Sequence, residues 1–101
     1  MPRALSTARA TVPREREAEY LATLAQLAGR MRARGEHLWL FRDPAAPGAF
    51  LEFSESASAE RHRTRLTRDA AEAALERTLA TIAAYAPGAR VLWEEVLLEE
   101  R

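Results

Sequence analysis

The stretch His37–Glu55, HLWLFRDPAAPGAFLEFSE, decides the fold of this chain. Apolar runs at 38–41 and 50–53 flank the segment RDPAAPG at 42–48, whose prolines and glycine cannot continue a helix or a central strand. The stretch therefore predicts a β-hairpin with a stiff loop. Because apolar side chains occupy successive positions in both runs, both faces of the predicted sheet must be covered.

The rest of the chain predicts two further strands and two main helices. Residues 4–12 alternate in polarity, with Arg9 on the row that faces away from the helices. Pro13 opens an acidic helical segment that Gly35 closes. The predicted elements are strands at 4–12, 37–42, 49–54 and 90–98, helices at 13–34 and 68–85, and a short helix at 58–66. This order predicts a single α+β domain over 1–101, a ferredoxin-like β-α-β-β-α-β fold whose four-stranded antiparallel sheet has both helices on one face.

Composition narrows the class of protein. The 101 residues include 15 basic and 15 acidic side chains, and this balance argues against nucleic acid or an anionic membrane as the main partner. No apolar run approaches the roughly 20 residues that span a membrane. The absence of cysteine and of a signal sequence is typical of a cytoplasmic protein. The absence of lysine excludes Schiff-base chemistry on a lysine side chain.

Two helices on one face leave the other face of the sheet without cover. Strict alternation along each strand places one row of side chains under the helices and the next row on the opposite face. We assign Leu38, Leu40, Leu51 and Phe53 to the helix face, and Trp39, Phe41, Phe50 and Glu52 to the opposite face. A second copy packed on that opposite face would cover it, so we expect a homodimer with a barrel-like interior.

Several short motifs also carry a resemblance. The Val12-Pro13 junction before an acidic helix, the hairpin segment 41–48, and Glu52 followed by a helix with His62 resemble the dimeric α+β barrel superfamily, in particular its antibiotic biosynthesis monooxygenase-like branch. The resemblance implies a homodimer with one pocket per subunit, between sheet and helices, and oxygenation of quinol-like aromatics without a cofactor. Haem-degrading members use an asparagine on the first strand. This chain has no asparagine, so haem binding through His62 or His37 is the least favoured alternative, and the resemblance implies no cofactor.

Glu52 and His62 are the candidate catalytic residues. Glu52 is a charge within an apolar strand, so its carboxylate must be paired or have a raised pKa. On the assigned row it would face the dimer interior, with Arg9 as its partner. Glu52 in that pair would act as a general base or a substrate anchor, or else the ion pair would only fix the dimer register. His62 matches the family's helical histidine and would shuttle a proton, or else it is a surface or capping residue.

The other candidates would bind a flat aromatic substrate. Trp39 and Trp93 would stack on it or pack in an interface, and His37 would lie at the pocket edge or at an exposed strand end. Arg9 or Arg65 would stabilise an anion formed when the base removes a phenolic proton. The complete predicted binding set is Arg9, His37, Trp39, Phe50, Arg65 and Trp93. No metal constellation is present. A non-catalytic binding protein with the same dimeric fold is the alternative.

Overall fold

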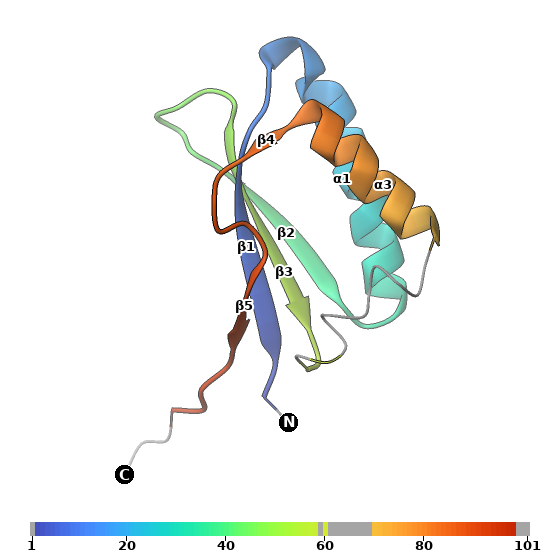
Figure 1. The fold of residues 1–101 in the computed structure, drawn as a ribbon, viewed down its shortest axis with the longest axis vertical. Coiled ribbons are helices and arrows are strands. Elements are labelled where there is room, and N and C mark those ends of the chain that lie inside the picture. Colours follow the sequence, from blue (N-terminus) through green and yellow to red (C-terminus); the bar gives the residue numbers. More distant parts are fainter. Residues whose placement is uncertain (1, 59, 61–69, 99–101) are drawn as a thin grey trace.

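The structure is a computed structural model that describes residues 2–58, 60 and 70–98 (Figure 1). A short 3-10 turn, η1 (Arg14–Arg16), leads into the first helix. The helices are α1 (Glu17–Ala33) and α3 (Ala70–Ile82), and the strands are β1 (Ala4–Thr11), β2 (His37–Arg42), β3 (Ala49–Ser56), β4 (Ala84–Tyr85) and β5 (Val91–Glu94).

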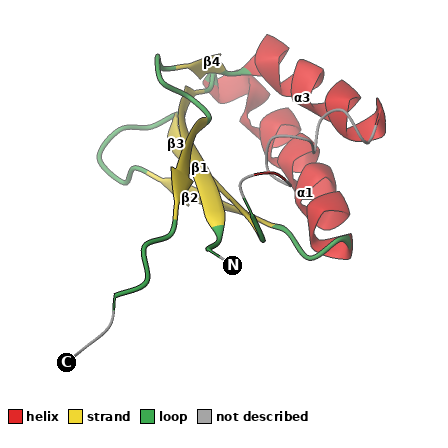
Figure 2. Cartoon of the chain, turned by 60° about the horizontal axis from the view of Figure 1, so that its bottom comes forward, coloured by secondary structure: helices red, strands yellow, loops and turns green. Residues whose placement is uncertain are grey.

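The sheet has the strand order β2-β3-β1-β4, and β5 also pairs with β1. All four pairings are antiparallel, so β4 and β5 together take the fourth position, beside β1. Figure 2 shows both helices on the same side of the sheet. The ferredoxin-like α+β fold predicted from the sequence is therefore confirmed.

The C-terminal elements differ from the prediction. Helix α3 ends at Ile82 rather than at 85, and the next two residues form β4. Pro87 and Gly88 then interrupt the edge, and pairing with β1 resumes where Arg90 N–H donates to the Thr7 carbonyl oxygen at 3.1 Å. Two short strands thus replace part of the predicted helix and the single long strand. The predicted short helix at 58–66 falls almost wholly outside the described residues.

The core lies between the sheet and the two helices. Small side chains of β1, Ala8 and Ala10, are buried beneath them, which permits close approach of the helical layer. The buried cluster consists of Ala10, Val12, Tyr20, Leu24, Leu27, Met31, Phe50, Leu79, Ile82 and Ala83, with Leu38, Leu40, Leu75 and Tyr85 packed against it. The structure confirms that Arg9 lies on the row that faces away from the helices, because neighbouring Ala8 and Ala10 are buried and Arg9 is exposed.

The register of the hairpin corrects the predicted assignment of β3. Leu40 pairs with Glu52, and Trp39 pairs with Phe53. Directly paired residues of an antiparallel ladder share a face, so Glu52 lies on the helix face together with Leu40. The prediction that Phe50 and Glu52 face away from the helices, and that Leu51 and Phe53 face toward them, is wrong. The hairpin segments are apolar on both faces, so their pattern does not distinguish two registers that differ by one residue.

Gly48 holds the end of the hairpin loop against β1. Its φ is +84°, Val12 N–H donates to its carbonyl oxygen at 2.8 Å, and a Cβ at this position would lie 2.7 Å from the Val12 carbonyl oxygen. We predict that Gly48→Ala lowers the free energy of unfolding by about 1–3 kcal/mol, because alanine is strained at positive φ and meets backbone there. Urea denaturation measures this change.

The matched control is Gly29→Ala, on helix α1, where nothing lies within 4 Å of the added Cβ. Alanine favours the helix, so this variant should gain up to about 1 kcal/mol. Equal stability of Gly48→Ala and the parent protein would contradict the role assigned to Gly48.

Candidate functional site

The candidate site is centred on the carboxylate of Glu52, which lies between the sheet and the helices. Its side chain is buried, with 6% of the residue exposed. The Oε2 atom accepts a hydrogen bond from the Tyr20 hydroxyl at 2.7 Å and another from the Tyr85 hydroxyl at 2.6 Å. These three residues come from β3, α1 and β4 respectively. One carboxylate oxygen thus joins the helical layer to the edge of the sheet.

Burial determines the electrostatics of this group. Desolvation raises the pKa of the Glu52 carboxyl above its usual value, and the hydrogen bonds from Tyr85 and Tyr20 offset part of that rise. The charge of Arg90 also lowers the pKa of Glu52, whereas that of Glu76 raises it. Burial, together with the adjacent carboxylate, raises the pKa of both tyrosine hydroxyls. The two phenols therefore keep their protons and act as donors.

Arg90 supports Tyr85 from outside the cluster. Its guanidinium carbon lies 5.4 Å from the centroid of the Tyr85 ring and its side chain forms an ion pair with Glu76 on α3. The backbone of Arg90 has a φ of 68°, a left-handed conformation that is uncommon for a residue with a side chain. On the other side, the Tyr20 ring packs 5.2 Å from the ring of Phe50. Both tyrosines are thus held in place by further contacts.

This arrangement has a definite chemical capability. A carboxylate with a raised pKa is a better proton acceptor at neutral pH than an ordinary glutamate. Glu52 already binds two phenolic hydroxyls, so its environment suits a third phenol of a small molecule. Two pockets at the hairpin end of the sheet are not lined by Glu52, so its carboxylate is enclosed by Tyr20 and Tyr85 and does not open into either of them.

The structure separates Glu52 from most of the predicted binding residues. Arg9 pairs in register with Leu51 and not with Glu52, so it lies on the opposite face of the sheet and the predicted Arg9–Glu52 pair is wrong. Trp39 and Trp93 are also on that opposite face, 42% and 59% exposed. Phe50 is the predicted binding residue that lies near Glu52, through its contact with Tyr20.

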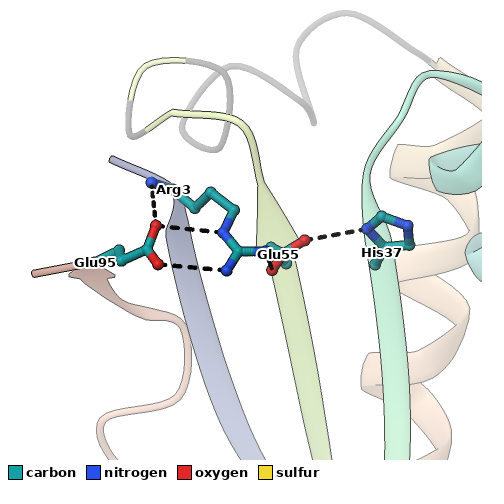
Figure 3. Close-up of polar contacts among 4 residues, drawn as sticks. All are labelled: Arg3, His37, Glu55 and Glu95. Atoms are coloured by element: carbon teal, nitrogen blue, oxygen red, sulfur yellow. Dashed lines mark hydrogen bonds and ion pairs between the residues drawn. The ribbon is translucent and has the colours of Figure 1, made fainter. Parts of the chain in front are cut away.

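His37 also lies on the opposite face, in a row of polar contacts that crosses the sheet (Figure 3). Its Nδ1 atom is 3.1 Å from Glu55 Oε1, and Glu55 Oε2 accepts a hydrogen bond from Arg3 at 3.0 Å. Arg3 also donates to Glu95 at 3.3 Å. The His37 ring stacks on Trp39 with centroids 5.3 Å apart. His37 thus connects strands and does not reach the carboxylate of Glu52.

Two predicted residues, His62 and Arg65, lie outside the described residues. Within the described part of the chain, no group of three or more His, Cys, Asp or Glu side chains is placed to hold a metal ion. The helices in that part are too short or too polar to cross a membrane.

Sequence reasoning missed the partners of Glu52. Tyr20 falls on the apolar stripe of the first helix, a position typical of core packing, and Tyr85 is the last residue of the predicted helix 68–85. A usable signal existed, because a buried carboxylate needs donors and this chain has just two tyrosines. Both of them serve Glu52.

A second group of buried charges joins the elements at the other end of α1. Arg34 donates to Glu36 through Nε and to Glu72 through both terminal nitrogens, with 2.7 Å between Nη2 and Glu72 Oε1. The two glutamates are 1% and 0% exposed. This bidentate contact fixes the start of β2 and helix α3 to the end of α1.

Comparison with known proteins identifies the fold. The sequence matches no protein-family model, and no curated protein sequence is similar to it. Among solved structures, a variant of SnoaB, a cofactor-independent oxygenase from Streptomyces nogalater, is similar with a TM-score of 0.77 at 15% identity, covering 95% of each chain. The chain has the fold of the antibiotic biosynthesis monooxygenase-like proteins. This confirms the predicted resemblance at the level of the fold.

Two further structures show the same likeness. A candidate antibiotic biosynthesis monooxygenase from Nitrosomonas europaea has a TM-score of 0.79 at 11% identity, over 93% of this chain and 90% of that one. Another from Caulobacter crescentus has a TM-score of 0.74 at 18% identity, over 97% of this chain and 92% of that one. Since these likenesses cover 93% and 97% of this chain, the similarity of fold includes nearly all of it.

The raised pKa of Glu52 leads us to predict how the free energy of unfolding depends on pH. Its usual value of 4.5 is raised in the folded protein, so ionising the buried carboxyl costs stability as the pH rises through the folded pKa. We therefore predict that the free energy of unfolding of the parent protein, relative to Glu52→Gln, falls as the pH rises above about 4.5. Urea denaturation of both proteins at a series of pH values from 4.5 upward measures the difference. A difference that rises with pH would show that Glu52 is stabilised as the anion.

Proposed function

We propose that this protein is a homodimer that oxygenates a small, electron-rich phenolic aromatic without a bound cofactor, with Glu52 as the general base. The observation that carries the proposal is the buried carboxylate of Glu52, which accepts hydrogen bonds from two phenols at 2.7 and 2.6 Å. The likeness to SnoaB, a cofactor-independent oxygenase, supports the reaction class.

The substrate enters by replacing Tyr85 at the carboxylate. Tyr85 belongs to a strand of two residues at the edge of the sheet, paired with β1 only at Ala10 and Thr11. Such a short strand is inexpensive to displace, compared with the helix that carries Tyr20. The substrate hydroxyl then takes the same hydrogen bond to Glu52 Oε2, and apolar side chains such as Phe50 and Leu79 contact its ring.

Glu52 removes the phenolic proton and becomes a neutral carboxylic acid, which its buried position favours. The negative charge is shared with a ring carbon next to the C–O group. That carbon transfers electrons to dioxygen and bonds to it, and the O–O bond of the resulting peroxide then breaks. The outer peroxide oxygen takes back the proton held by Glu52, and Glu52 then removes the hydrogen of the oxygenated ring carbon as a proton. A carbonyl forms at that carbon, and the outer oxygen leaves as hydroxide, which this second proton converts to water. The ring, oxidised to a quinone, supplies the electrons.

Tyr20 and Arg90 would assist this step. The Tyr20 hydroxyl keeps its hydrogen bond to Glu52 and so holds the carboxyl in place. Arg90, whose charge already acts on Glu52, stabilises the substrate anion in the role first expected of Arg9 or Arg65. His62 stays a candidate for a second proton transfer.

The dimer rests on the uncovered face of the sheet. Phe41, Val91 and Trp93 are 55%, 51% and 59% exposed there, and neither α1 nor α3 lies on that side in Figure 2. Trp39 packs against Phe53 on the same face, with ring centroids 5.7 Å apart. Full burial of each such side chain contributes roughly 1.5–3 kcal/mol, so a second copy gains substantially by covering this face.

We predict that the protein sediments with the mass of two chains and that Trp39→Glu shifts it toward one chain, because the substitution places a charge in the interface. The control is Leu21→Glu. Leu21 is similarly exposed, at 37% against 42% for Trp39, but lies on α1 away from this face. Sedimentation velocity at micromolar concentration measures both variants. A single-chain mass for the parent protein would contradict the dimer.

Oxygen uptake tests the reaction. We predict that the parent protein consumes oxygen with members of a panel of hydroquinones, and that Glu52→Gln lowers the rate by about 100-fold or more, the usual effect of losing a general base. Glu19→Gln, which alters a surface carboxylate paired with Arg16, should leave the rate unchanged. If no hydroquinone is turned over while the protein still binds them, the non-catalytic binding protein is the better description.

A further inference from the structure

The segment Ala84–Arg90, which we call the strap, links helix α3 to strand β5 along the edge of the sheet. Figure 1 shows it as β4 followed by a loop that leads to β5. In the described part of the chain, backbone hydrogen bonds hold it to β1 at two points beyond β4, where Ala86 N–H and Arg90 N–H donate to carbonyl oxygens at 2.9 and 3.1 Å. Pro87, between them, has no N–H to donate. Few backbone bonds therefore attach the strap to the sheet, and its position depends on side chains.

The strap covers the carboxylate of Glu52 through Tyr85. The Tyr85 hydroxyl donates to Glu52 Oε2 at 2.6 Å. The next residue, Ala86, lines a pocket of about 490 Å³ at the hairpin end of the sheet, whereas Glu52 does not line it. Displacement of the strap would remove Tyr85 from the carboxylate and uncover it on the side of this pocket. The strap thus stands between the pocket and Glu52.

Arg90 fastens the strap to helix α3. Its guanidinium carbon lies 5.4 Å from the centroid of the Tyr85 ring, and its Nη1 atom forms an ion pair with Glu76 Oε2. The Glu76 side chain is 10% exposed, against 35% for that of Arg90. Because one partner is buried, water and salt screen this pair less than a pair of two exposed groups. Tyr85 is therefore held from both sides, by Arg90 on its ring and by Glu52 at its hydroxyl.

The backbone of Arg90 is in a strained conformation. Its φ of 68° lies in the left-handed region, where the Cβ of an ordinary residue is crowded. Such a conformation persists where surrounding contacts enforce it. The ion pair with Glu76 is one of those contacts, and it comes from a helix outside the strap. Loss of this ion pair would let Arg90 return to an ordinary φ and release the strap.

We propose that Glu76 is a positioning residue that controls access to Glu52. Its ion pair with Arg90 holds the strap closed and keeps Tyr85 on the carboxylate, so it sets how readily a phenol replaces Tyr85. This inference rests on the proposed function, in which the substrate takes the place of Tyr85. The apparent affinity of a ligand that binds the open state is reduced in proportion to the fraction of molecules that are open. Breaking the ion pair therefore increases the affinity for phenols.

Glu76→Gln tests the proposal, because it removes the charge and keeps the size of the side chain. The probe is para-nitrophenol, whose electron-poor ring resists oxygenation, so its binding is measured apart from turnover. In equilibrium dialysis we expect Glu76→Gln to bind it about tenfold more tightly than the parent protein does, as a tenfold larger open fraction requires. Glu76→Asp, which keeps the charge on a shorter side chain, should bind with intermediate affinity. Glu19→Gln, which alters the surface pair with Arg16, should bind like the parent.

Hydrogen exchange measures the strap itself. The N–H groups of Ala86 and Arg90 donate to β1 in the closed strap. We expect both amides to exchange about tenfold faster in Glu76→Gln than in the parent protein, because the strap opens more often. The amides of the β1–β3 ladder should exchange as they do in the parent. Faster exchange in that ladder as well would show a general loss of stability and overturn the positioning role.

The two measurements together separate the outcomes. Tighter binding without faster exchange of Ala86 and Arg90 would mean that the charge of Glu76 acts directly on Glu52, which overturns the control by the strap. Faster exchange with equal or weaker binding would overturn the control of access and leave the proposed function standing. If neither protein binds the probe, the proposed function fails, and unchanged exchange would in addition overturn the role of Glu76 in holding the strap.

Discussion

The hydrogen bonds that Tyr20 and Tyr85 donate to Glu52 depend on, and reinforce, the register of the whole sheet. A buried carboxylate without donors would be severely destabilising, whereas two phenols at 2.7 and 2.6 Å satisfy one of its oxygens. Tyr20 comes from α1 and Tyr85 from β4. The two hydrogen bonds therefore join the centre of the sheet to the helical layer and to the edge strand. A slip of one residue between β2 and β3 would move Glu52 to the other face and break both bonds.

Much of the fold could be predicted from the sequence because it depends on local patterns. The prolines and Gly48 of the hairpin, the helical spacing of Leu24 and Leu27, and the order of the elements were sufficient for the ferredoxin-like architecture. The orientation of β3 could not be predicted in this way. Phe50, Leu51 and Phe53 are all apolar, so either row of side chains on this strand could face the helices. Alternation alone assigned Glu52 to the row that faces the dimer interior, with Arg9 as its partner, whereas its hydrogen bonds with Tyr20 and Tyr85 place it on the helix face.

The candidate site was harder to predict than the fold for the same reason. Tyr20 and Tyr85 are separated from Glu52 by 32 and 33 residues, and their role depends on where β3 and β4 meet α1. Tyr85 leaves the helix because α3 ends at Ile82, which no pattern in the alanine-rich segment reveals. Spacing within an element indicates a face, but a site assembled from three elements needs the register between them.

The corrected register also divides the roles of the two faces. With Glu52 inside, Trp39, Phe41, Leu51 and Phe53 form a continuous apolar patch on the outer face of β2 and β3. Glu55 borders this patch, where it is paired with Arg3 and His37. A continuous apolar patch is better suited to a second copy than one interrupted by a carboxylate. Conversely, Glu52, Tyr20 and Tyr85 all belong to one chain, so the proton acceptor and its donors are complete without the partner. The proposed chemistry on the inner face and the proposed assembly on the outer face can therefore be altered independently, since the thickness of the sheet separates them.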